Sequence, residues 1–158
     1  MKVSRTKPER ARLALTLQIA VNSPGLPAKA RLRRWLAAAV DRSAEITVRF
    51  VGVAESRRLN RAYRGRDCAT NVLSFDYGKP GRGQVLTGDL VLCAPVLRCE
   101  ARAQGKPLAA HVAHLTVHGA LHLQGHDHQT PGAAVRMEKL EKKILAKLGF
   151  PDPYAGDT

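Results

Sequence analysis

The sequence predicts an α+β fold, in which a small mixed β-sheet with about five helices packed against it forms a single domain. Three observations support this expectation. A chain of 158 residues can bury the core of one domain. Segments with strand and helix patterns alternate along it, as in proteins where helices cover a sheet. No internal repeat, low-complexity segment or break in composition marks a second domain.

The first segment of the chain is basic, and the first predicted strand follows it. Residues 1–12 have little apolar content and are expected to form a flexible N-terminal arm. In LALTLQIAV (Leu13–Val21) apolar side chains recur at strand spacing, which predicts a strand. Residues 13–154 then form the domain, and residues 155–158 a short tail. The basic residues of the arm are Lys2, Arg5, Lys7, Arg10 and Arg12.

Helix and strand signals alternate through the middle of the chain. Ala28–Asp41 is rich in helix formers and places apolar residues on one side, which predicts a helix. Ile46–Val53 is β-branched, which predicts a strand. Ala54–Gly65 is predicted to be a helix that ends at its glycine.

Two further strands and three helices are expected in the rest of the chain. The predicted strands are Thr70–Phe75 and Gly88–Cys93, with a glycine-rich loop at Gly78–Gly83 between them. The predicted helices are Ala94–Gln104, Leu108–Leu123 and Pro131–Leu148.

The charge of the chain indicates a polyanionic partner. There are 26 Lys and Arg residues against 13 Asp and Glu residues, so the formal net charge is +13. A basic surface attracts and holds phosphates, as in nucleic-acid binding, although it can also serve only solubility. Aromatic residues make up 4% of the sequence, too few for a surface that stacks one base after another. Binding would therefore depend mainly on backbone phosphates.

The cysteines and the apolar segments indicate a cytoplasmic protein. Cys68, Cys93 and Cys99 have no CxxC spacing, so we expect reduced and mostly buried thiols rather than a disulfide framework. No stretch approaches the roughly 20 apolar residues of a membrane span. Thr16 and Gln18 interrupt the apolar run near the N-terminus, which argues against a signal peptide.

All six histidines lie between residues 111 and 128. His118 and His122 are four residues apart, a spacing at which two side chains of one helix can bind the same metal ion. Gly125 follows where a helix end favours a residue with positive φ, so that His128 can return towards the same ion. Three neutral imidazoles with a fourth position left to water are typical of a catalytic zinc site. We therefore predict one zinc ion per chain, at nitrogens that nickel or copper could also occupy.

The same histidine spacing occurs in zinc peptidases, which need a glutamate directly after the first histidine as general base. Here that position is Gly119, which leaves room for a substrate or for a neighbouring element. Asp127 is the only carboxylate within the motif, and we expect it to orient an imidazole or to cap the turn. The sequence therefore argues against a peptidase.

Arginines are concentrated in the predicted helix Ala54–Gly65 and directly after it. Arg57, Arg61 and Arg64 share one helical stripe, and Arg58 and Arg66 lie nearby. Guanidinium groups bind phosphate in a bidentate manner and stabilise charge that develops on a phosphoryl group. We interpret Arg57, Arg61 and Arg66 as substrate-binding residues. A solvated basic face is the alternative.

HGALHLQGHDH (His118–His128) resembles the signature of the YbeY endoribonuclease family of bacterial rRNA maturation factors. The resemblance extends over about Leu13–Tyr154. The other segments that resemble the family are LNRAYRGRDCATNVLSF (Leu59–Phe75), GDLVLC (Gly88–Cys93), QGKPLAAHVAHLTVHGALH (Gln104–His122) and LGFPDPY (Leu148–Tyr154).

This resemblance implies a single-domain α+β fold and a zinc ion held by His118, His122 and His128. It also implies that Arg64, in YRG, is a catalytic cation near the metal. The implied activity is zinc-dependent endonucleolytic cleavage of single-stranded RNA, in 16S rRNA 3′-end maturation and ribosome quality control. The implied partners are rRNA of the small subunit and, as an open question, ribosomal proteins and an assembly GTPase or helicase.

Two questions stay open at this point. The attacking group can be a metal-bound water or the RNA 2′-hydroxyl, and Arg64 would stabilise the charge on phosphorus in either case. The chain can also be a non-catalytic, zinc-stabilised assembly or RNA-binding factor. We expect His111, His114 and His126 to lie on a helix face or in a cleft, without an assigned role.

Overall fold

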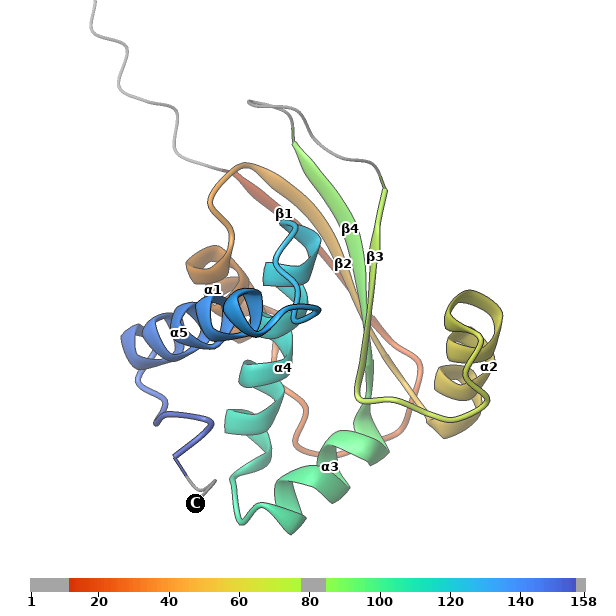
Figure 1. The fold of residues 1–158 in the computed structure, drawn as a ribbon. Helices are drawn as coiled ribbons and strands as arrows, with labels where there is room; N and C mark the ends of the chain where they lie inside the picture. Colours follow the sequence, from red (N-terminus) through yellow and green to blue (C-terminus); the bar gives the residue numbers. More distant parts are fainter. Residues whose placement is uncertain (1–11, 78–84, 156–158) are drawn as a thin grey trace, which may run out of the picture.

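A four-stranded mixed sheet forms the centre of the protein in a computed structural model that describes residues 12–77 and 85–155 (Figure 1). The strand order across the sheet is β1-β2-β4-β3. β1 and β2 pair in parallel, β2 and β4 pair in parallel, and β3 runs antiparallel to β4. The strands are β1 (Leu13–Ile19), β2 (Ala44–Val51), β3 (Val72–Asp76) and β4 (Leu86–Cys93).

The five helices of the described residues are α1 (Lys29–Ala39), α2 (Val53–Arg64), α3 (Ala94–Ala103), α4 (Leu108–Leu123) and α5 (Pro131–Lys147). The predicted α+β fold with a small mixed sheet is confirmed. The predicted N-terminal arm except Arg12, the loop at Gly78–Gly83 and the last three tail residues lie outside the described residues.

Helices cover both faces of the sheet. α1, α4 and α5 lie on one face, and α2 lies on the other (Figure 1). The larger core fills the first face, where Phe50, Leu90 and Leu92 are fully buried against helix residues such as Leu36 and Val117. A smaller cluster under α2 includes Val51, Leu73, Val91 and Cys93, with Leu59 of α2 packed against it. The two faces of β3 therefore meet different helices, α4 on one side and α2 on the other.

The close contact between α4 and the sheet depends on glycine. A Cβ atom at Gly119 would lie 2.8 Å from Cδ2 of Leu90 and 3.3 Å from Oγ of Ser74. At Gly88 of β4, a Cβ would lie 2.7 Å from Cδ2 of Leu123. Such distances are below ordinary contact between carbon atoms. The room predicted at Gly119 is therefore occupied by strands β3 and β4.

One expectation about the cysteines is wrong. Cys93 is buried, but Cys68 and Cys99 are exposed. Cys68 follows the end of α2 in a connection, and Cys99 lies on the solvent side of α3, whose buried face is formed by Leu97 and Ala101. A helix turns about 100° per residue, so a position midway between two core positions points away from the core.

No helix in the described part of the chain is long and apolar enough to cross a membrane.

Candidate metal centre

The C-terminal end of α4 redirects the chain at Gly125. Gly125 has a φ of +94°, the left-handed region in which a side chain would be strained. Its N–H donates to the carbonyl of His122, and the N–H of His126 donates to the carbonyl of Leu121. These two bonds are those of a Schellman motif, which satisfies carbonyls at a helix end. The predicted helix stop is confirmed, and the turn allows the following residues to approach α4 again.

Three histidines come together at this turn. The ligand-capable atoms of His118, His122 and His128 all lie within 4.8 Å of one another. His118 and His128 stack with ring planes 15° apart, and their Nε2 atoms are 3.2 Å apart. Two nitrogens bound to zinc at about 2.0–2.1 Å in tetrahedral geometry lie roughly 3.3 Å apart. The donor set and its spacing therefore fit a zinc ion.

The surroundings of His122 favour a neutral ring. Burial lowers the pKa of His122 to about 4, and the neighbouring His118 and His128 add to this effect. An imidazole must be neutral to offer a lone pair to a metal ion. At neutral pH, His122 is therefore ready to act as a ligand without first losing a proton.

Glu141 of α5 is a site residue that the sequence reasoning missed. Its side chain is fully buried, and its Oε1 lies 2.6 Å from Nδ1 of His118. Burial by itself would raise the pKa of Glu141, but contacts with His114, His118 and Tyr154 lower it to about 2. Glu141 shares the buried stripe of α5 with Met137 and Leu145. A carboxylate in an otherwise apolar stripe is the signal in the sequence that could have found it.

Arg64 lines a pocket of about 540 Å³ together with two of the three histidines. The pocket is lined by Arg64, His118 and His122, together with residues of β3, and we call it the Arg64 pocket. Arg64 is the last residue of α2, where its Nη2 donates to the carbonyl of Ser74 at 2.7 Å. Its guanidinium also lies over the ring of Phe75, 5.6 Å from the centroid. Strand β3 thus holds Arg64 on the pocket that His118 and His122 also line.

The family of the chain can be established from comparison with known proteins. A family model described as Endoribonuclease YbeY matches residues 27–149. The chain belongs to the YbeY endoribonuclease family.

Individual relatives support this assignment over nearly the whole chain. The Endoribonuclease YbeY of Aromatoleum aromaticum is 57% identical over 153 residues, which cover 95% of this chain and 97% of that protein. The Endoribonuclease YbeY of Thiobacillus denitrificans is 52% identical and covers 90% of this chain and 96% of its own length. A solution structure of a Thermotoga maritima protein has the same fold, with a TM-score of 0.51 at 19% identity, covering 85% of this chain and 92% of that one.

The three arginines that the sequence predicted to bind substrate in this YbeY-family chain lie at two places. Arg66 shares a surface depression of about 410 Å³ with Arg64. Arg57 and Arg61 line a separate depression of about 660 Å³ on α2. Arg57 makes a two-bond ion pair with Asp67, from Nε at 2.7 Å and from Nη2 at 2.9 Å. A phosphate that binds Arg57 would therefore compete with Asp67.

Asp127 stabilises the turn that carries His128. Its Oδ1 accepts a hydrogen bond from the backbone N–H of Gln129 at 3.2 Å, an Asx-type turn. Thr130 then caps α5, with its Oγ1 accepting from the N–H of Ala133. Two roles are expected for Asp127 from the sequence, to orient an imidazole or to cap the turn. The hydrogen bond to Gln129 supports the second.

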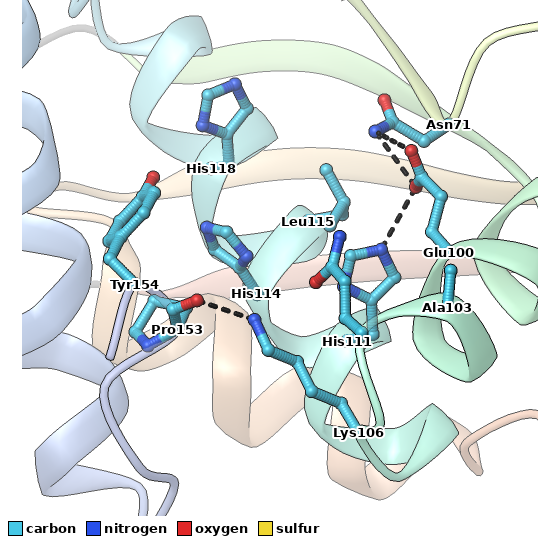
Figure 2. A pocket seen from close by; sticks show the side chains of 11 residues that line it. Asn71, Glu100, Ala103, Lys106, His111, His114, Leu115, His118, Pro153 and Tyr154 are labelled. Atoms are coloured by element: carbon cyan, nitrogen blue, oxygen red, sulfur yellow. Dashed lines mark hydrogen bonds and ion pairs between the residues drawn. The ribbon is translucent and has the colours of Figure 1, made fainter. Parts of the chain in front are cut away.

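A second pocket, of about 550 Å³, also has His118 in its lining (Figure 2). His111, His114 and Glu100 line it, and we call it the His114 pocket. Nε2 of His111 lies 3.0 Å from Oε1 of Glu100. Nε2 of His114 lies 3.4 Å from Oε1 of Glu141, but not in hydrogen-bond geometry. His111 and His114 therefore line a cleft that also contains His118, while His126 lies in the segment after α4.

Proposed function

We propose that this chain is a zinc-dependent endoribonuclease that cuts single-stranded RNA, in 16S rRNA 3′-end maturation and ribosome quality control. The observation that carries the proposal is that Arg64 lines one pocket together with His118 and His122, two of the three convergent histidines. The names of the relatives, Endoribonuclease YbeY, support the substrate class and the reaction. Such a substrate places the proposed activity in the cytoplasm.

His118, His122 and His128 would hold the metal ion. When bound, the ion would supply Lewis-acid chemistry, with a polarised water or phosphate oxygen as its target. Arg64 would bind the scissile phosphate and stabilise the negative charge that builds up in the transition state. Its hydrogen bond to Ser74 and its contact with Phe75 hold the guanidinium in place before substrate arrives.

The remaining arginines would bind the RNA strand outside the reacting phosphate. Arg66 is placed to contact a phosphate next to the one at Arg64, because the two share a depression. Arg57 and Arg61 would bind a more distant part of the strand on the outer surface of α2. Each such contact contributes to affinity through charge and counterion release, and the contribution weakens as salt rises.

Neither the residue at the position of the peptidase base nor the buried Glu141 is placed to act as the general base of a peptidase. Gly119 stands at the position of the peptidase base and packs against the sheet. Glu141 is buried, with one oxygen at His118 and the other at Tyr154, so it is not free to deprotonate a water in the pocket. A non-catalytic assembly factor with a zinc site is the remaining alternative, and the following experiment separates it from the enzyme.

The experiment compares cleavage of a labelled single-stranded RNA by the wild type, His118→Ala and His126→Ala, purified identically and assayed for zinc content. We expect zinc binding and cleavage in the wild type and in His126→Ala, and loss of both in His118→Ala. His126 is the matched control because it lies in the same motif but outside the three convergent histidines. Equal cleavage by all three proteins would identify a contaminating nuclease. Zinc binding without cleavage would favour the assembly factor.

The ends of the RNA products identify the nucleophile. A 2′,3′-cyclic phosphate forms only when the adjacent 2′-hydroxyl attacks the phosphate. Attack by water with loss of the 3′-oxygen leaves a 5′-phosphate and a 3′-hydroxyl. Attack by the 2′-hydroxyl cannot give these ends, because a cyclic phosphate hydrolyses only to a 2′- or 3′-phosphate. Mass spectrometry of the products from the wild-type reaction distinguishes the two.

A further inference from the structure

A charged side chain lies in the core directly behind one of the proposed ligands. Glu141 is 0% exposed, in a stripe of α5 that is otherwise apolar. A buried carboxylate is costly unless each oxygen has a partner. Its Oε1 is 2.6 Å from Nδ1 of His118, and its Oε2 accepts a hydrogen bond of 2.6 Å from the hydroxyl of Tyr154. Both oxygens are therefore engaged, and one partner is a histidine of the metal centre.

This arrangement selects one tautomer of the neutral His118 ring. A carboxylate only accepts hydrogen bonds, so Nδ1 of His118 must carry the proton that bridges to Glu141. In the neutral ring, the lone pair is then on Nε2. Nε2 is the atom that lies 3.2 Å from Nε2 of His128, on the side where the three histidines converge. The hydrogen bond at Nδ1 thus favours the tautomer whose Nε2 can donate its lone pair to a metal ion.

Tyr154 is itself held in place by the C-terminal segment. Its backbone N–H donates to Oδ1 of Asp152, and its ring packs edge-on against His114. Lys142 lies over the ring, 5.7 Å from the centroid. Nζ of Lys106 donates to the carbonyl of Pro153 (Figure 2). These contacts fasten the end of the chain beside Glu141.

We propose that Glu141 and Tyr154 are positioning residues for the metal centre, with Tyr154 holding the carboxylate and the carboxylate holding the ring and the tautomer of His118. The inference rests on the proposed function, because it assumes that His118 binds a metal ion through Nε2. α5 and the C-terminal segment provide none of the three convergent histidines. According to this inference they nevertheless contribute to the affinity for the metal ion.

The test measures zinc affinity by competition with a chromophoric chelator. Loss of a partner behind a metal-binding histidine typically costs about 10–100-fold in metal affinity. We expect a loss of this size for Glu141→Ala and a smaller one, about tenfold at most, for Tyr154→Phe. Glu141→Gln keeps an oxygen that can accept from Nδ1 and should restore part of the affinity. Glu138→Gln is the matched control, since Glu138 lies on the same helix without a hydrogen bond to the histidines.

A second readout reports on the tautomer rather than on affinity. In the imidazole ¹H–¹⁵N spectrum of the zinc-loaded protein, we expect a protected Nδ1 proton on His118. It should remain in Glu138→Gln and exchange rapidly with water in Glu141→Ala. A purely structural role for Glu141 would lower stability without this spectroscopic change.

The outcomes separate this inference from the proposed function. If the wild type binds no zinc, the proposed function itself fails, and the inference fails with it. If the wild type binds zinc and both Glu141→Ala and Tyr154→Phe bind it equally well, only the inference is overturned. An equal loss in Glu138→Gln also overturns it, because a general charge effect would then explain the result. Should Glu141→Ala fail to fold, Tyr154→Phe and Glu141→Gln decide.

Discussion

Single side chains of the site are held by contacts from neighbouring elements of the fold. Arg64 is the clearest case, because its guanidinium bonds to the carbonyl of Ser74 and lies over Phe75. These contacts leave the arginine exposed on the pocket that it shares with His118 and His122. A cation fixed in this way loses little conformational freedom when a phosphate binds, which favours transition-state stabilisation.

The first prediction at this scale concerns Arg64. We expect Arg64→Ala to lower kcat for RNA cleavage by about 10²–10³-fold, the usual effect of removing one group that stabilises developing charge. Zinc content should not change, because the hydrogen bond of Arg64 goes to β3 and not to the histidines. Arg34→Ala, an exposed arginine on α1, is the control and should cleave normally. Full activity of zinc-loaded Arg64→Ala would refute the assigned role.

The second prediction concerns His111 and pH. Burial lowers the pKa of His111, and the bond to Glu100 of α3 only partly opposes this; His114 and Lys106 lower it further. Between this lowered pKa and about 6.5, the unfolded chain binds more protons than the folded chain. The contribution of His111 to the free energy of unfolding is therefore complete above about pH 6.5 and falls as the pH decreases below it.

Urea unfolding at pH 7.5 and 5.5, with chelator present so that metal release does not contribute, measures this effect. We expect the wild type to lose more stability than His111→Gln between the two pH values, by at most about 1.4 kcal/mol per pH unit. An identical pH dependence in the two proteins would show that His111 titrates equally in the folded and unfolded states.

At the scale of secondary-structure elements, α4 carries the site because it is packed closely against the sheet. Gly119 allows this contact, with Leu90 and Ser74 on the other side. The Schellman motif at Gly125 then ends the helix at the point where His128 can return. Gln124 joins this end to α1, since its Nε2 donates to the carbonyl of Ala39. The position of the three histidines thus depends on the packing of one helix.

We predict that Gly119→Ala destabilises the protein. Overpacking in a core costs about 1–3 kcal/mol, more than the gain of roughly 1 kcal/mol that alanine brings to a helix interior. The neighbour, Leu90, is fully buried and has little room to move. Gly132→Ala in α5 is the control, because its Cβ would meet only the end of the Arg136 side chain at 3.5 Å. Urea unfolding compares them, and equal stability of the two variants would contradict the packing argument.

At the scale of the whole molecule, the hydrophobic core is buried, whereas the three convergent histidines are in part accessible to solvent. His118 and His122 are half-buried and His128 is exposed, while the apolar side chains of both clusters are buried. The core joins the sheet to α1, α4 and α5, with a smaller cluster beneath α2. A fold of this kind has its own source of stability, so a metal ion would add to it rather than create it.

The corresponding prediction is that chelation removes activity but not structure. A ligand at about 100 times its Kd adds roughly 2.7 kcal/mol to stability, which is about 5–10 °C in Tm for a chain of this size. We expect a Tm decrease of this order, an unchanged far-UV circular dichroism spectrum at 25 °C and loss of RNA cleavage. Complete unfolding on chelation would indicate a structural zinc site and favour the assembly factor.

The sequence by itself determined the elements and the three convergent histidines. Strand and helix patterns are local, because a strand repeats every two residues and a helix every 3.6. The predicted segments therefore agree with the observed ones to within a few residues. The histidines could be found for the same reason, since HxxxHxxGxxH brings three nitrogens together through one helix turn and one glycine.

Only the tertiary structure decided what surrounds those histidines. Glu141 lies 23 residues from His118 along the chain, and Arg64 lies still further away. Their proximity to the histidines in space therefore does not follow from a local repeat. The pairing of Arg57 with Asp67 also does not follow from a local pattern. Contacts between distant elements depend on how helices pack on the sheet, and packing is a property of the whole core rather than of any single segment.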